Sequence, residues 1–348
     1  MTFHAVAAPV GVREADLRYT AECARIDAFV RERAGSPFHL AAWSRAVEQG
    51  CGQRARYLVA ERADGAIAGV LPLTEIRSRL FGRALVSAGF AVGGGVLGDA
   101  VEPLASGAWA LAERLGIAEV ELRGGAVPTG WTVDDATYLG FARPLAADDE
   151  AELLAIPRKQ RAQVRRALGL DLTIAAGRDR AALAEHHRVY AESVHHLGTP
   201  VFPAALFRAV IGSMDADVLT IRHQGMAVAS VLSLYADGTV YPYWGGGRAA
   251  ARGLRANDRM YLALMSHARA RGCTRFDFGR SKAGTGAAAF KKNWGFEGTP
   301  LAYAKRSVGA ARAVNPLDSR YAAKVALWKR LPLPVATAIG PWISRGLG

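Results

Sequence analysis

An acidic residue within an apolar strand is the first feature that could take part in a reaction. Residues 275–280 read RFDFGR, so strand alternation places Phe276 and Phe278 on one face and Asp277 on the other. Such a carboxylate serves either as a structural acceptor for backbone or arginine groups, or as the wall or base of a cleft. Asp277 is our first candidate for a proton relay, and Glu192 is the second.

A lysine between aromatic residues is the second feature. Residues 290–296 read FKKNWGF, and they follow SKAGTG at 281–286, which is too small and polar for a core. Lys291 could stabilise a phosphate or a developing oxyanion. A surface lysine flanked by core aromatics would give the same composition. We predict that Lys291 contacts a donor or the oxyanion, with Tyr243 near the reacting centre.

A loop rich in glycine and arginine could bind phosphate. Residues 245–257 read GGGRAAARGLRAN and join a strand to the start of a helix, where free N–H groups and the helix dipole favour an anion. The glycines could also serve only a wide turn. We predict that the phosphates of a donor bind here, to Arg248, Arg252, Arg255 and Asn257.

A second basic segment precedes this loop. Residues 157–168 read PRKQRAQVRRAL and predict a short helix whose cations suit phosphate binding. Charge alone favours a solvated helix face equally. The candidates in this segment are Arg158, Arg161 and Arg165.

Several other kinds of site are disfavoured. The histidines at 186, 187, 195 and 196 lack the i, i+4 pairing of a helical metal site, so we expect no metal. The chain contains no GxSxG, GxxxxGK[ST] or strand-following GxGxxG pattern, which argues against serine hydrolases, P-loop proteins and Rossmann domains. Its three cysteines form neither a metal pair nor a disulfide framework, so a reducing compartment is expected.

The elements that must position these residues occur in the same order twice. Residues 56–76 predict a hairpin turning at Asp64-Gly65, followed by an apolar helical stripe that ends at Gly116 and then a strand. In the second half, a hairpin around Gly225 precedes a helix that starts at Asn257 or Asp258, and a strand follows that helix. We infer a duplicated α/β fold, although two unrelated α/β domains could share so coarse an order.

Length and composition allow two domains. The chain has 348 residues, of which 51% are apolar, and its net charge of +13 favours polyanions or an anionic leaflet. A basic but inert surface is the alternative. A polar stretch at 146–150 marks the expected boundary, so we predict domains at 1–150 and 151–307 and a tail at 308–348. No leader or membrane-spanning stretch is evident, which predicts a cytoplasmic protein or one peripheral on the inner face of the cytoplasmic membrane.

Motifs throughout the second half match one known family. The matching segments are PRKQR at 157–161, YAESV at 190–194, LGTPVFP at 197–203, YWGG at 243–246, AND at 256–258, FDFGRSK at 276–282, GTG at 284–286 and FKKNWGF at 290–296. The first half shows looser signs, namely SPFH at 36–39, AW at 42–43 and GVLPL at 69–73. Over about residues 30–307 the chain resembles the FemAB-like branch of the GNAT superfamily, especially the members associated with envelope polysaccharides.

The resemblance implies tandem GNAT-like domains, each a mixed, mostly antiparallel sheet flanked by helices. It also implies acyl transfer to an amine on a lipid or glycan precursor of the cell envelope, with Lys291 near the donor phosphate or reacting carbonyl. Acyl-CoA is the expected donor, and a long-chain base, as in bacterial ceramide synthases, is one expected acceptor. The donor-binding set also includes Gly279, Arg280, Ser281 and Lys282.

Two rival functions follow from the same residues. Aminoacyl-tRNA could be the donor, as in family members that build peptidoglycan cross-bridges, but those members often carry a long helical arm and no long heptad segment occurs here. A non-catalytic pair of domains that binds envelope glycans or lipid is the other rival. In the enzymatic reading, the acceptor amine attacks the donor carbonyl directly, without an acyl-enzyme.

The C-terminal tail predicts an amphipathic helix. Its apolar face carries Leu317, Tyr321, Val325, Trp328 and Leu331, and its cations are Arg320, Lys324, Lys329 and Arg330. Together with the apolar run at 339–343, this helix could rest on an anionic membrane and collect a lipid substrate. Packing against the protein's own domains is the alternative.

Overall fold

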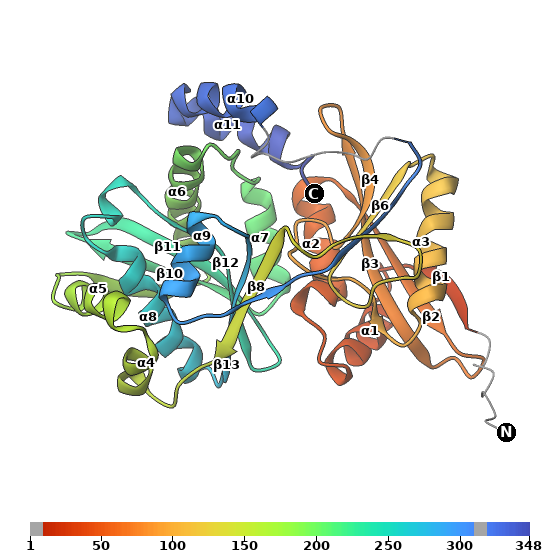
Figure 1. Cartoon of the computed structure of the whole chain (residues 1–348), viewed down its shortest axis with the longest axis horizontal. Helices are drawn as coiled ribbons and strands as arrows, with labels where there is room; N and C mark the ends of the chain where they lie inside the picture. Colours follow the sequence, from red (N-terminus) through yellow and green to blue (C-terminus); the bar gives the residue numbers. More distant parts are fainter. Residues whose placement is uncertain (1–9, 310–318) are drawn as a thin grey trace. The chain divides into compact units, whose positions relative to one another are not determined.

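The computed structural model describes residues 10–309 and 319–348 (Figure 1). The chain divides into two compact units, each built on one sheet. Of the described residues, 10–135, 302–309 and 346–348 belong to the first unit, and 136–301 and 319–345 belong to the second. Among the described residues, no helix is both long and apolar enough to span a bilayer.

The first unit packs helices on both faces of its sheet. α3 covers one face over a core that includes Leu58, Leu71 and Leu104, while α1 and α2 pack at a second core around Ile26 and Tyr57. The elements of this unit are β1 (Gly11–Ala15), α1 (Thr20–Glu32), η1 (Pro37–His39), α2 (Ala41–Cys51), β2 (Arg54–Glu61), β3 (Ile67–Ser78), β4 (Gly82–Ser87), β5 (Leu97–Gly98), α3 (Val101–Leu115), β6 (Glu119–Arg123), β7 (Thr132–Asp134) and β15 (Tyr303–Ser307).

The second unit repeats this layered arrangement. α5, α8 and α9 bury an apolar core against one face of its sheet, and α6 contacts strands β9 to β12. The elements are β8 (Tyr138–Pro144), α4 (Asp149–Ala155), α5 (Arg158–Leu168), β9 (Thr173–Gly177), α6 (Arg180–Leu197), α7 (Ala204–Ser213), β10 (Ala216–His223), β11 (Met226–Ala236), β12 (Thr239–Gly247), η2 (Ala249–Ala251), α8 (Ala256–Ala270), β13 (Arg275–Lys282), α9 (Gly286–Asn293), β14 (Gly298–Pro300), α10 (Ser319–Arg330) and α11 (Leu333–Ser344).

Each sheet is mixed and mostly antiparallel. The strand order is β1-β2-β3-β4-β6-β15-β7 in the first sheet and β14-β8-β13-β12-β11-β10-β9 in the second. Only the β4–β6 and β12–β13 pairs run parallel among the described strands, and in each a helix, α3 or α8, connects the two strands. The predicted α/β fold with two similar halves is therefore confirmed.

Each sheet also contains a strand from a distant part of the sequence. β8 precedes residue 150, where we expected the domain boundary, and it pairs with β13 and β14 of the second sheet. β15 lies within the expected second domain, at 151–307, and it pairs with β6 and β7 of the first sheet. These pairings join residues more than a hundred positions apart, so no local sequence pattern predicts them.

The local signals of turns and helix ends correspond closely to the structure. Gly65 has a φ of +83° in the turn between β2 and β3, and Gly116 has a φ of +62° directly after α3. One expected cap is wrong: α8 begins at Ala256, so Asn257 and Asp258 lie within its first turn and do not cap it. Asp258 instead accepts a hydrogen bond from Gln160 of α5 at 2.6 Å.

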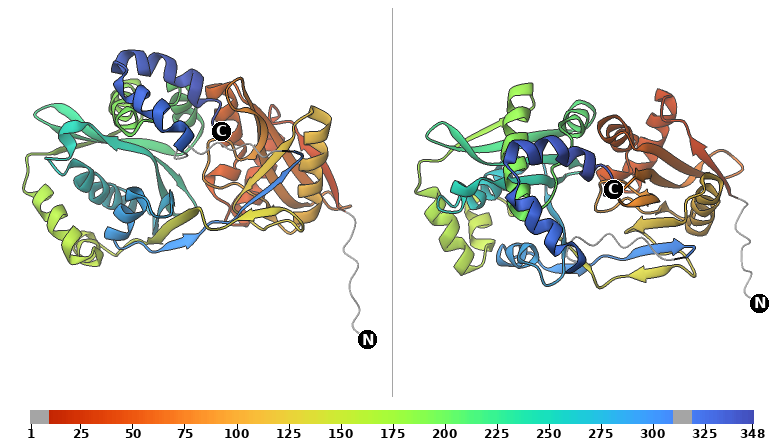
Figure 2. Two further views of the ribbon diagram at one scale, coloured as in Figure 1. Left: turned by 45° about the horizontal axis from the view of Figure 1, so that its top comes forward. Right: turned by 90° about the horizontal axis from the view of Figure 1, so that it is seen from above.

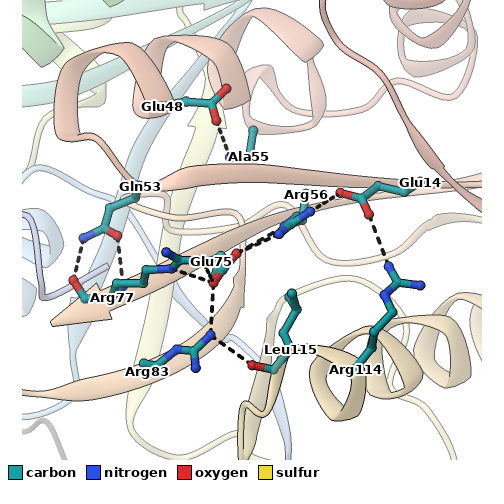
Figure 3. Close-up of polar contacts among 10 residues, drawn as sticks. All are labelled: Glu14, Glu48, Gln53, Ala55, Arg56, Glu75, Arg77, Arg83, Arg114 and Leu115. Carbon is teal, nitrogen blue, oxygen red and sulfur yellow. Dashed lines mark hydrogen bonds and ion pairs between the residues drawn. The ribbon is translucent and has the colours of Figure 1, made fainter.

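A buried carboxylate organises polar contacts in the first sheet (Figure 3). The side chain of Glu75, on β3, is 0% exposed and bonds to Arg56 at 3.1 Å, Arg77 at 2.6 Å and Arg83 at 3.2 Å. Burial alone would raise the pKa of Glu75, but the hydrogen bonds from Arg77 and Arg56 outweigh it and hold the pKa below its usual range. Glu75 is therefore an ionised structural acceptor.

The C-terminal helices pack on the second unit beside α6 (Figures 1 and 2). The backbone carbonyl of Trp328 lies 3.1 Å from His195 Nε2, and Ser344 Oγ donates to the carbonyl of Val201 at 2.8 Å. The expected alternative of packing against the protein's own domains is thus observed for one face of the tail. Leu317 lies outside the described residues, as do the side chains of Arg320 and Tyr321.

Candidate active site

The site begins where two parallel strands of the second sheet separate. β12 and β13 pair only at Thr239–Arg275 and Val240–Phe276, although β12 continues to Gly247 and β13 to Lys282. Beyond Val240 the two strands are not paired with each other. The sheet therefore opens at the ends of these strands, where the chain turns into η2 and α8.

Both separating strands carry an irregularity near the opening. On β12 the register shifts at Tyr243, because Leu232 lies opposite Trp244 and Ser233 lies opposite Pro242. On β13 a similar shift occurs between Asp277 and Arg280. β-Bulges redirect side chains and often lie next to active sites. Sequence reasoning selected Tyr243 and Asp277 as chemical groups, but it did not predict the bulges that orient them.

A cavity of about 580 Å³ lies at the end of β12. Its walls come from the end of α6, the glycine-arginine loop, the start of α8, and α9. The lining residues are Ser193, His196, Leu197, Gly245, Gly246, Gly247, Arg248, Ala249, Ala251, Arg252, Asn257, Tyr261 and Phe290. The predicted loop and the FKKNWGF segment thus border one cavity, although Phe290 rather than Lys291 lines it.

The glycines of this loop make room for the neighbouring side chains. A Cβ at Gly246 would overlap the side chain of Ser193, and one at Gly247 would lie 2.7 Å from Asn257 Oδ1. Neither glycine has a positive φ, so their role is close packing rather than an unusual backbone conformation. The cavity therefore depends on the absence of side chains at these positions.

The start of α8 offers hydrogen-bond groups to the cavity. Arg255 precedes the helix with a φ of +51°, and its side chain makes no capping hydrogen bond. An uncapped helix start presents backbone N–H donors and the positive end of the helix dipole. Asn257 Oδ1 is buried and has no hydrogen-bond partner among the described residues. Such a start, beside Arg252, is suited to an anion.

Arg248 is held by one of the predicted proton relays. Its Nε donates to Glu192 Oε2 at 2.8 Å, and the N–H of Ala249 donates to Glu192 Oε1 at 3.3 Å. Burial opposes ionisation of Glu192, but the hydrogen bond from Arg248 prevails and lowers its pKa. In this arrangement Glu192 fixes the loop and carries a negative charge, which leaves Arg252 as the exposed cation of the lining.

Asp277 lies at the point where the strands separate. Its Oδ1 accepts a hydrogen bond from the N–H of Gly279 at 2.8 Å, across the bulge of β13. Burial raises the pKa of Asp277, and the backbone hydrogen bond from Gly279 opposes this shift only in part. A carboxyl group of raised pKa is suited to exchange a proton with a substrate.

Lys291 does not line the cavity, but it contacts the same bulge of β13. Its ammonium donates to the carbonyls of Gly279 at 3.0 Å and Arg280 at 2.8 Å, and it lies over the rings of Phe141 and Phe278. Burial lowers the pKa of Lys291 to about 8, although Asp277 partly offsets this effect. An ammonium has three N–H donors, so one remains beyond these two hydrogen bonds.

The remaining predicted donor-binding residues do not line the cavity. Gly279, with a φ of +70°, and Arg280 belong to the bulge. Ser281, which is buried, and Lys282, which is half-buried, pair with β8. Arg158, Arg161 and Arg165 lie on α5, which packs on α8. Arg161 Nε donates to the carbonyl of Ile156 at 3.1 Å, whereas Arg158 and Arg165 are exposed.

Several lining residues were missed by the sequence reasoning. Ser193, His196 and Leu197 come from the last turns of α6, and Tyr261 and Phe290 complete the opposite wall. The matching motifs YAESV, LGTPVFP and FKKNWGF contain or adjoin most of these residues. Their presence in one cavity requires the sheet to bring α6, α8 and α9 together, which no spacing along the chain predicts.

The histidines on α6 have structural contacts. His186 Nδ1 lies 2.9 Å from Ser230 Oγ, and His187 Nε2 lies 3.2 Å from the carbonyl of Phe202. Burial lowers the pKa of His186 to about 3, so it is neutral. The described part of the chain contains no group of three or more His, Cys, Asp or Glu side chains placed to hold a metal ion.

In the first unit, the segment that corresponds to the glycine-arginine loop is held by contacts with neighbouring side chains. Residues 88–95 follow β4, as the glycine-arginine loop follows β12, but four groups hold their carbonyls. Trp43 donates to Gly89, Arg123 to Ala91 and Tyr303 to Val92, and His39 Nε2 lies 3.1 Å from the carbonyl of Gly95. Ala88, Phe90 and Ala91 are all buried. This segment therefore offers no counterpart of the open loop.

A cavity of about 780 Å³ in the first unit has a different character. Its lining includes Arg18 and Arg56, but Asp16 pairs with Arg18 and Glu14 pairs with Arg56. The lining also has no helix start of the kind found at α8. Size alone does not identify a reaction site, and we therefore place the candidate site in the second unit.

Comparisons with known proteins give one family match, and it falls in the second unit. Residues 156–292 match the model of a family described as an acetyltransferase (GNAT) domain. This range contains the cavity lining, Asp277 and Lys291. A sequence search of curated proteins found no match.

Solved structures share the fold of the whole chain. The crystal structure of FemX is 15% identical, has a TM-score of 0.64, and is matched over 84% of this chain and 96% of that one. The C-terminal domain of a putative lysylphosphatidylglycerol synthetase from Agrobacterium fabrum is 14% identical, with a TM-score of 0.56 and coverage of 91% and 96%. A tandem GNAT protein from the clavulanic acid biosynthesis pathway is 10% identical, with a TM-score of 0.56 and coverage of 87% and 100%.

The structural similarity to FemX and the duplicated sheets agree with the fold that the FemAB-like resemblance implies. The GNAT match falls on the unit whose strands separate beside an uncapped helix start. The second unit therefore carries a match to the GNAT acetyltransferase domain at residues 156–292, and most of the chain has the fold of these solved structures, with two similar units in tandem.

Proposed function

We propose that this enzyme transfers an acyl group from an acyl-CoA-type thioester to an amine of a membrane-associated envelope precursor. The observation that carries the proposal is the cavity of the second unit, which combines an open strand pair with an uncapped helix start. A phosphorylated donor fits such a site, because its phosphates can meet backbone N–H groups and a cation.

The donor phosphates bind between the start of α8 and Arg252. Arg248 and Glu192 hold the loop in place through their 2.8 Å ion pair. Asn257 Oδ1 provides an acceptor for an N–H group of the donor, which would satisfy this otherwise unpartnered atom. Arg255, Gly279, Arg280, Ser281 and Lys282 support the loop and the bulge around the donor.

The reaction is a direct acyl transfer. The neutral acceptor amine attacks the thioester carbonyl, and the third N–H of Lys291 stabilises the oxyanion. Asp277 takes the proton from the attacking nitrogen, directly or through a water, and the thiolate leaves as the C–S bond breaks. That proton then neutralises the thiolate, so an amide and a free thiol are the products. Tyr243, at the bulge of β12, lies near the reacting centre.

The acceptor amine belongs to a lipid or glycan precursor, and a long-chain base is the first candidate. A net charge of +13 favours an anionic surface such as the inner face of the cytoplasmic membrane. We propose that the enzyme works there as a peripheral protein.

Transfer from aminoacyl-tRNA is the second candidate function. The observation that favours it is the exposure of Arg158 and Arg165 on α5, outside the cavity. A polyanion much longer than CoA could contact both α5 and the cavity. This reading predicts binding to tRNA whose affinity falls steeply with added salt.

Product analysis tests the proposal. Purified protein is incubated with acyl-CoAs of several chain lengths and with candidate amines, and mass spectrometry detects amide products. Lys291→Ala should abolish turnover without lowering the melting temperature appreciably, whereas Lys292→Ala, which changes the exposed neighbour, should retain it. Product formed only from aminoacyl-tRNA would select the second candidate, and no binding of either donor in calorimetry would support a non-catalytic scaffold.

The position of the donor phosphates is tested separately by substitution of Arg252, the exposed cation of the cavity lining. Arg252→Ala should raise the KM for the donor about tenfold with little change in kcat, since a charge-assisted phosphate contact is lost. The matched control is Arg188→Ala, which removes an exposed arginine of α6 that does not line the cavity. Equal effects of the two substitutions would move the donor phosphates away from this loop.

A further inference from the structure

Helix α11 has two faces of different character. Ala336, Gly340 and Ser344 are buried, at spacings of four residues, and a Cβ at Gly340 would lie 3.0 Å from Val201. The small residues therefore dock this face tightly on the second unit. Because the docking is close, the orientation of the opposite face is determined by the fold.

The opposite face of α11 is apolar and exposed. Val335, Ile339 and Trp342 are 45%, 42% and 50% exposed, and the exposed Ala338 lies between them in the same stripe. These four positions follow the i, i+3, i+4, i+7 spacing of one helix face. Leu327 on α10, at 65% exposed, adds a further apolar side chain near the C-terminal helices. Exposed apolar stripes of this kind mark interaction surfaces.

The charge of the segment specifies the kind of partner. Residues 319–348 contain five cations and no acidic residue, the cations being Arg320, Lys324, Lys329, Arg330 and Arg345. α11 itself has no charged residue, so the cations come from α10 and from Arg345 directly after α11. A segment that combines an apolar stripe, a tryptophan and neighbouring cations is typical of those that lie in the headgroup region of a bilayer. An acidic protein partner would match the charge, but it would not need a continuous apolar stripe.

The C-terminal helices are also connected to the candidate active site. His195 of α6 contacts the carbonyl of Trp328, and a Cβ at Gly198 would meet Val325 and Lys329. The adjacent residues of α6, Ser193, His196 and Leu197, line the cavity. One short stretch of α6 and the following loop thus contacts both the cavity and the C-terminal helices.

We propose that the outer face of α11, formed by Val335, Ala338, Ile339 and Trp342, docks the enzyme on an anionic lipid bilayer. The apolar stripe enters the headgroup region, while cations of α10 and Arg345, which follows α11, attract anionic lipids. When the enzyme is docked in this way, the end of α6 lies close to the membrane. A lipid amine then reaches the cavity without leaving the bilayer surface. This inference deepens the proposed use of a membrane-associated acceptor, but its test needs neither donor nor acceptor.

Vesicle binding by the full-length protein tests the inference. The wild-type protein is expected to co-sediment with phosphatidylcholine vesicles that contain phosphatidylglycerol, and binding should weaken when the anionic lipid is omitted or salt is added. The double variant Ile339→Ser/Trp342→Ser should lower the partition coefficient about tenfold or more, because the centre of the apolar stripe is lost. Met226→Ser, which changes a 62% exposed side chain at the start of β11, is the matched control and should bind as the wild type does.

A fluorescence measurement covers the case in which the double variant folds poorly. Trp342→Phe preserves the apolar stripe, so binding should persist, while quenching of tryptophan emission by brominated phosphatidylglycerol should be largely lost. Unchanged quenching in Trp342→Phe, or unchanged binding by the folded double variant, would overturn the inference. So would a wild-type dimer in sedimentation that the double variant abolishes without vesicles, because a second copy would then cover the stripe. Transfer to a soluble amine without vesicle binding would reject only this inference, whereas vesicle binding without transfer would reject only the proposed function.

Discussion

Lys291 is a buried cation that forms no ion pair with a carboxylate among the described residues. Its ammonium contacts two backbone carbonyls and two aromatic faces, and burial lowers its pKa to about 8. Desolvating an ammonium in this way is costly. A buried group of shifted pKa beside a raised-pKa carboxyl, Asp277, is typical of catalytic sites.

The pH dependence of kcat/KM tests the role of Lys291. The proposed mechanism uses its protonated form, so the rate should fall as the pH rises through about 8. In Lys291→Arg the guanidinium stays protonated, and any residual activity should lack this alkaline decline. Rates are measured with one acceptor throughout, so that ionisation of the acceptor amine affects both proteins equally. The same alkaline decline in the wild type and in Lys291→Arg would mean that another ionising group causes it.

Gly246 illustrates how a missing side chain can create a site. A Cβ there would overlap Ser193, so Gly246→Ala should displace the wall of the cavity and weaken donor binding about tenfold or more in calorimetry. Gly253→Ala is the control, because its Cβ would find the nearest atom 3.9 Å away. If both variants bind the donor as the wild type does, the donor does not occupy this cavity.

At the scale of elements, the two units use the same pattern for different purposes. Both contain a hairpin, a third strand, a helix and a parallel fourth strand. In the second unit the loop after the third strand borders a cavity, whereas residues 88–95 of the first unit are held by Trp43, Arg123, Tyr303 and His39. The loop, rather than the sheet, therefore decides which unit is suited to a donor.

The first sheet should depend on its buried carboxylate. Glu75→Gln leaves Arg56, Arg77 and Arg83 without their shared partner, so it should destabilise the protein by about 3–5 kcal/mol at neutral pH. Because the folded-state pKa of Glu75 is lowered, its contribution is present above its unfolded-state pKa and is lost as the pH falls through the folded-state value. The free energy of unfolding, measured in urea, should therefore differ between the wild type and Glu75→Gln by less at acidic pH than at neutral pH.

Glu48 provides the control for this prediction (Figure 3). Its exposed side chain makes only a 3.4 Å contact with the N–H of Ala55 among the interactions shown, so Glu48→Gln should change stability by less than about 0.5 kcal/mol. Equal destabilisation by both substitutions would mean that the arginine cluster around Glu75 contributes no more than a surface contact.

At the scale of the whole molecule, strand exchange links the two halves of the sequence. β8 precedes every other strand of the second sheet in the sequence, and β15 follows every strand of that sheet. Each nevertheless completes a sheet by pairing beside the fourth strand of the pattern. Such non-local pairings must form late in chain synthesis. The stability of the first unit therefore depends on β15, which lies outside that unit's main sequence range.

A substitution in β8 should weaken the second unit. Phe141 is 1% exposed and belongs to the core of that unit, so Phe141→Ala should cost about 3–5 kcal/mol. Hydrogen exchange should accelerate in α8 and β13 more than in β2 and β3. Leu58→Ala, in the core of the first unit, should give the opposite distribution. A uniform acceleration by both variants would show that the units unfold as one.

The amino-acid sequence by itself determined the elements and the chemical groups. Apolar periodicity and the glycines at turns and helix ends were sufficient to predict the hairpins, α3 and the duplicated order of elements, because these signals act within a few residues. The residue types of Asp277, Lys291 and the glycine-arginine loop were likewise sufficient to select candidate groups, and the cavity is lined by residues of that loop and by Phe290, next to Lys291 in the sequence.

Only the tertiary structure decided how those groups are used. Three features of the site depend on residues that are distant along the chain. They are the separation of β12 from β13, the bulges at Tyr243 and Asp277, and the pairing of Glu192 with Arg248. The same holds for the exposed stripe of α11, since the sequence shows an amphipathic tail but not which face the second unit covers. Packing between distant segments minimises buried unpaired groups and voids across the whole molecule, and no local pattern contains that information.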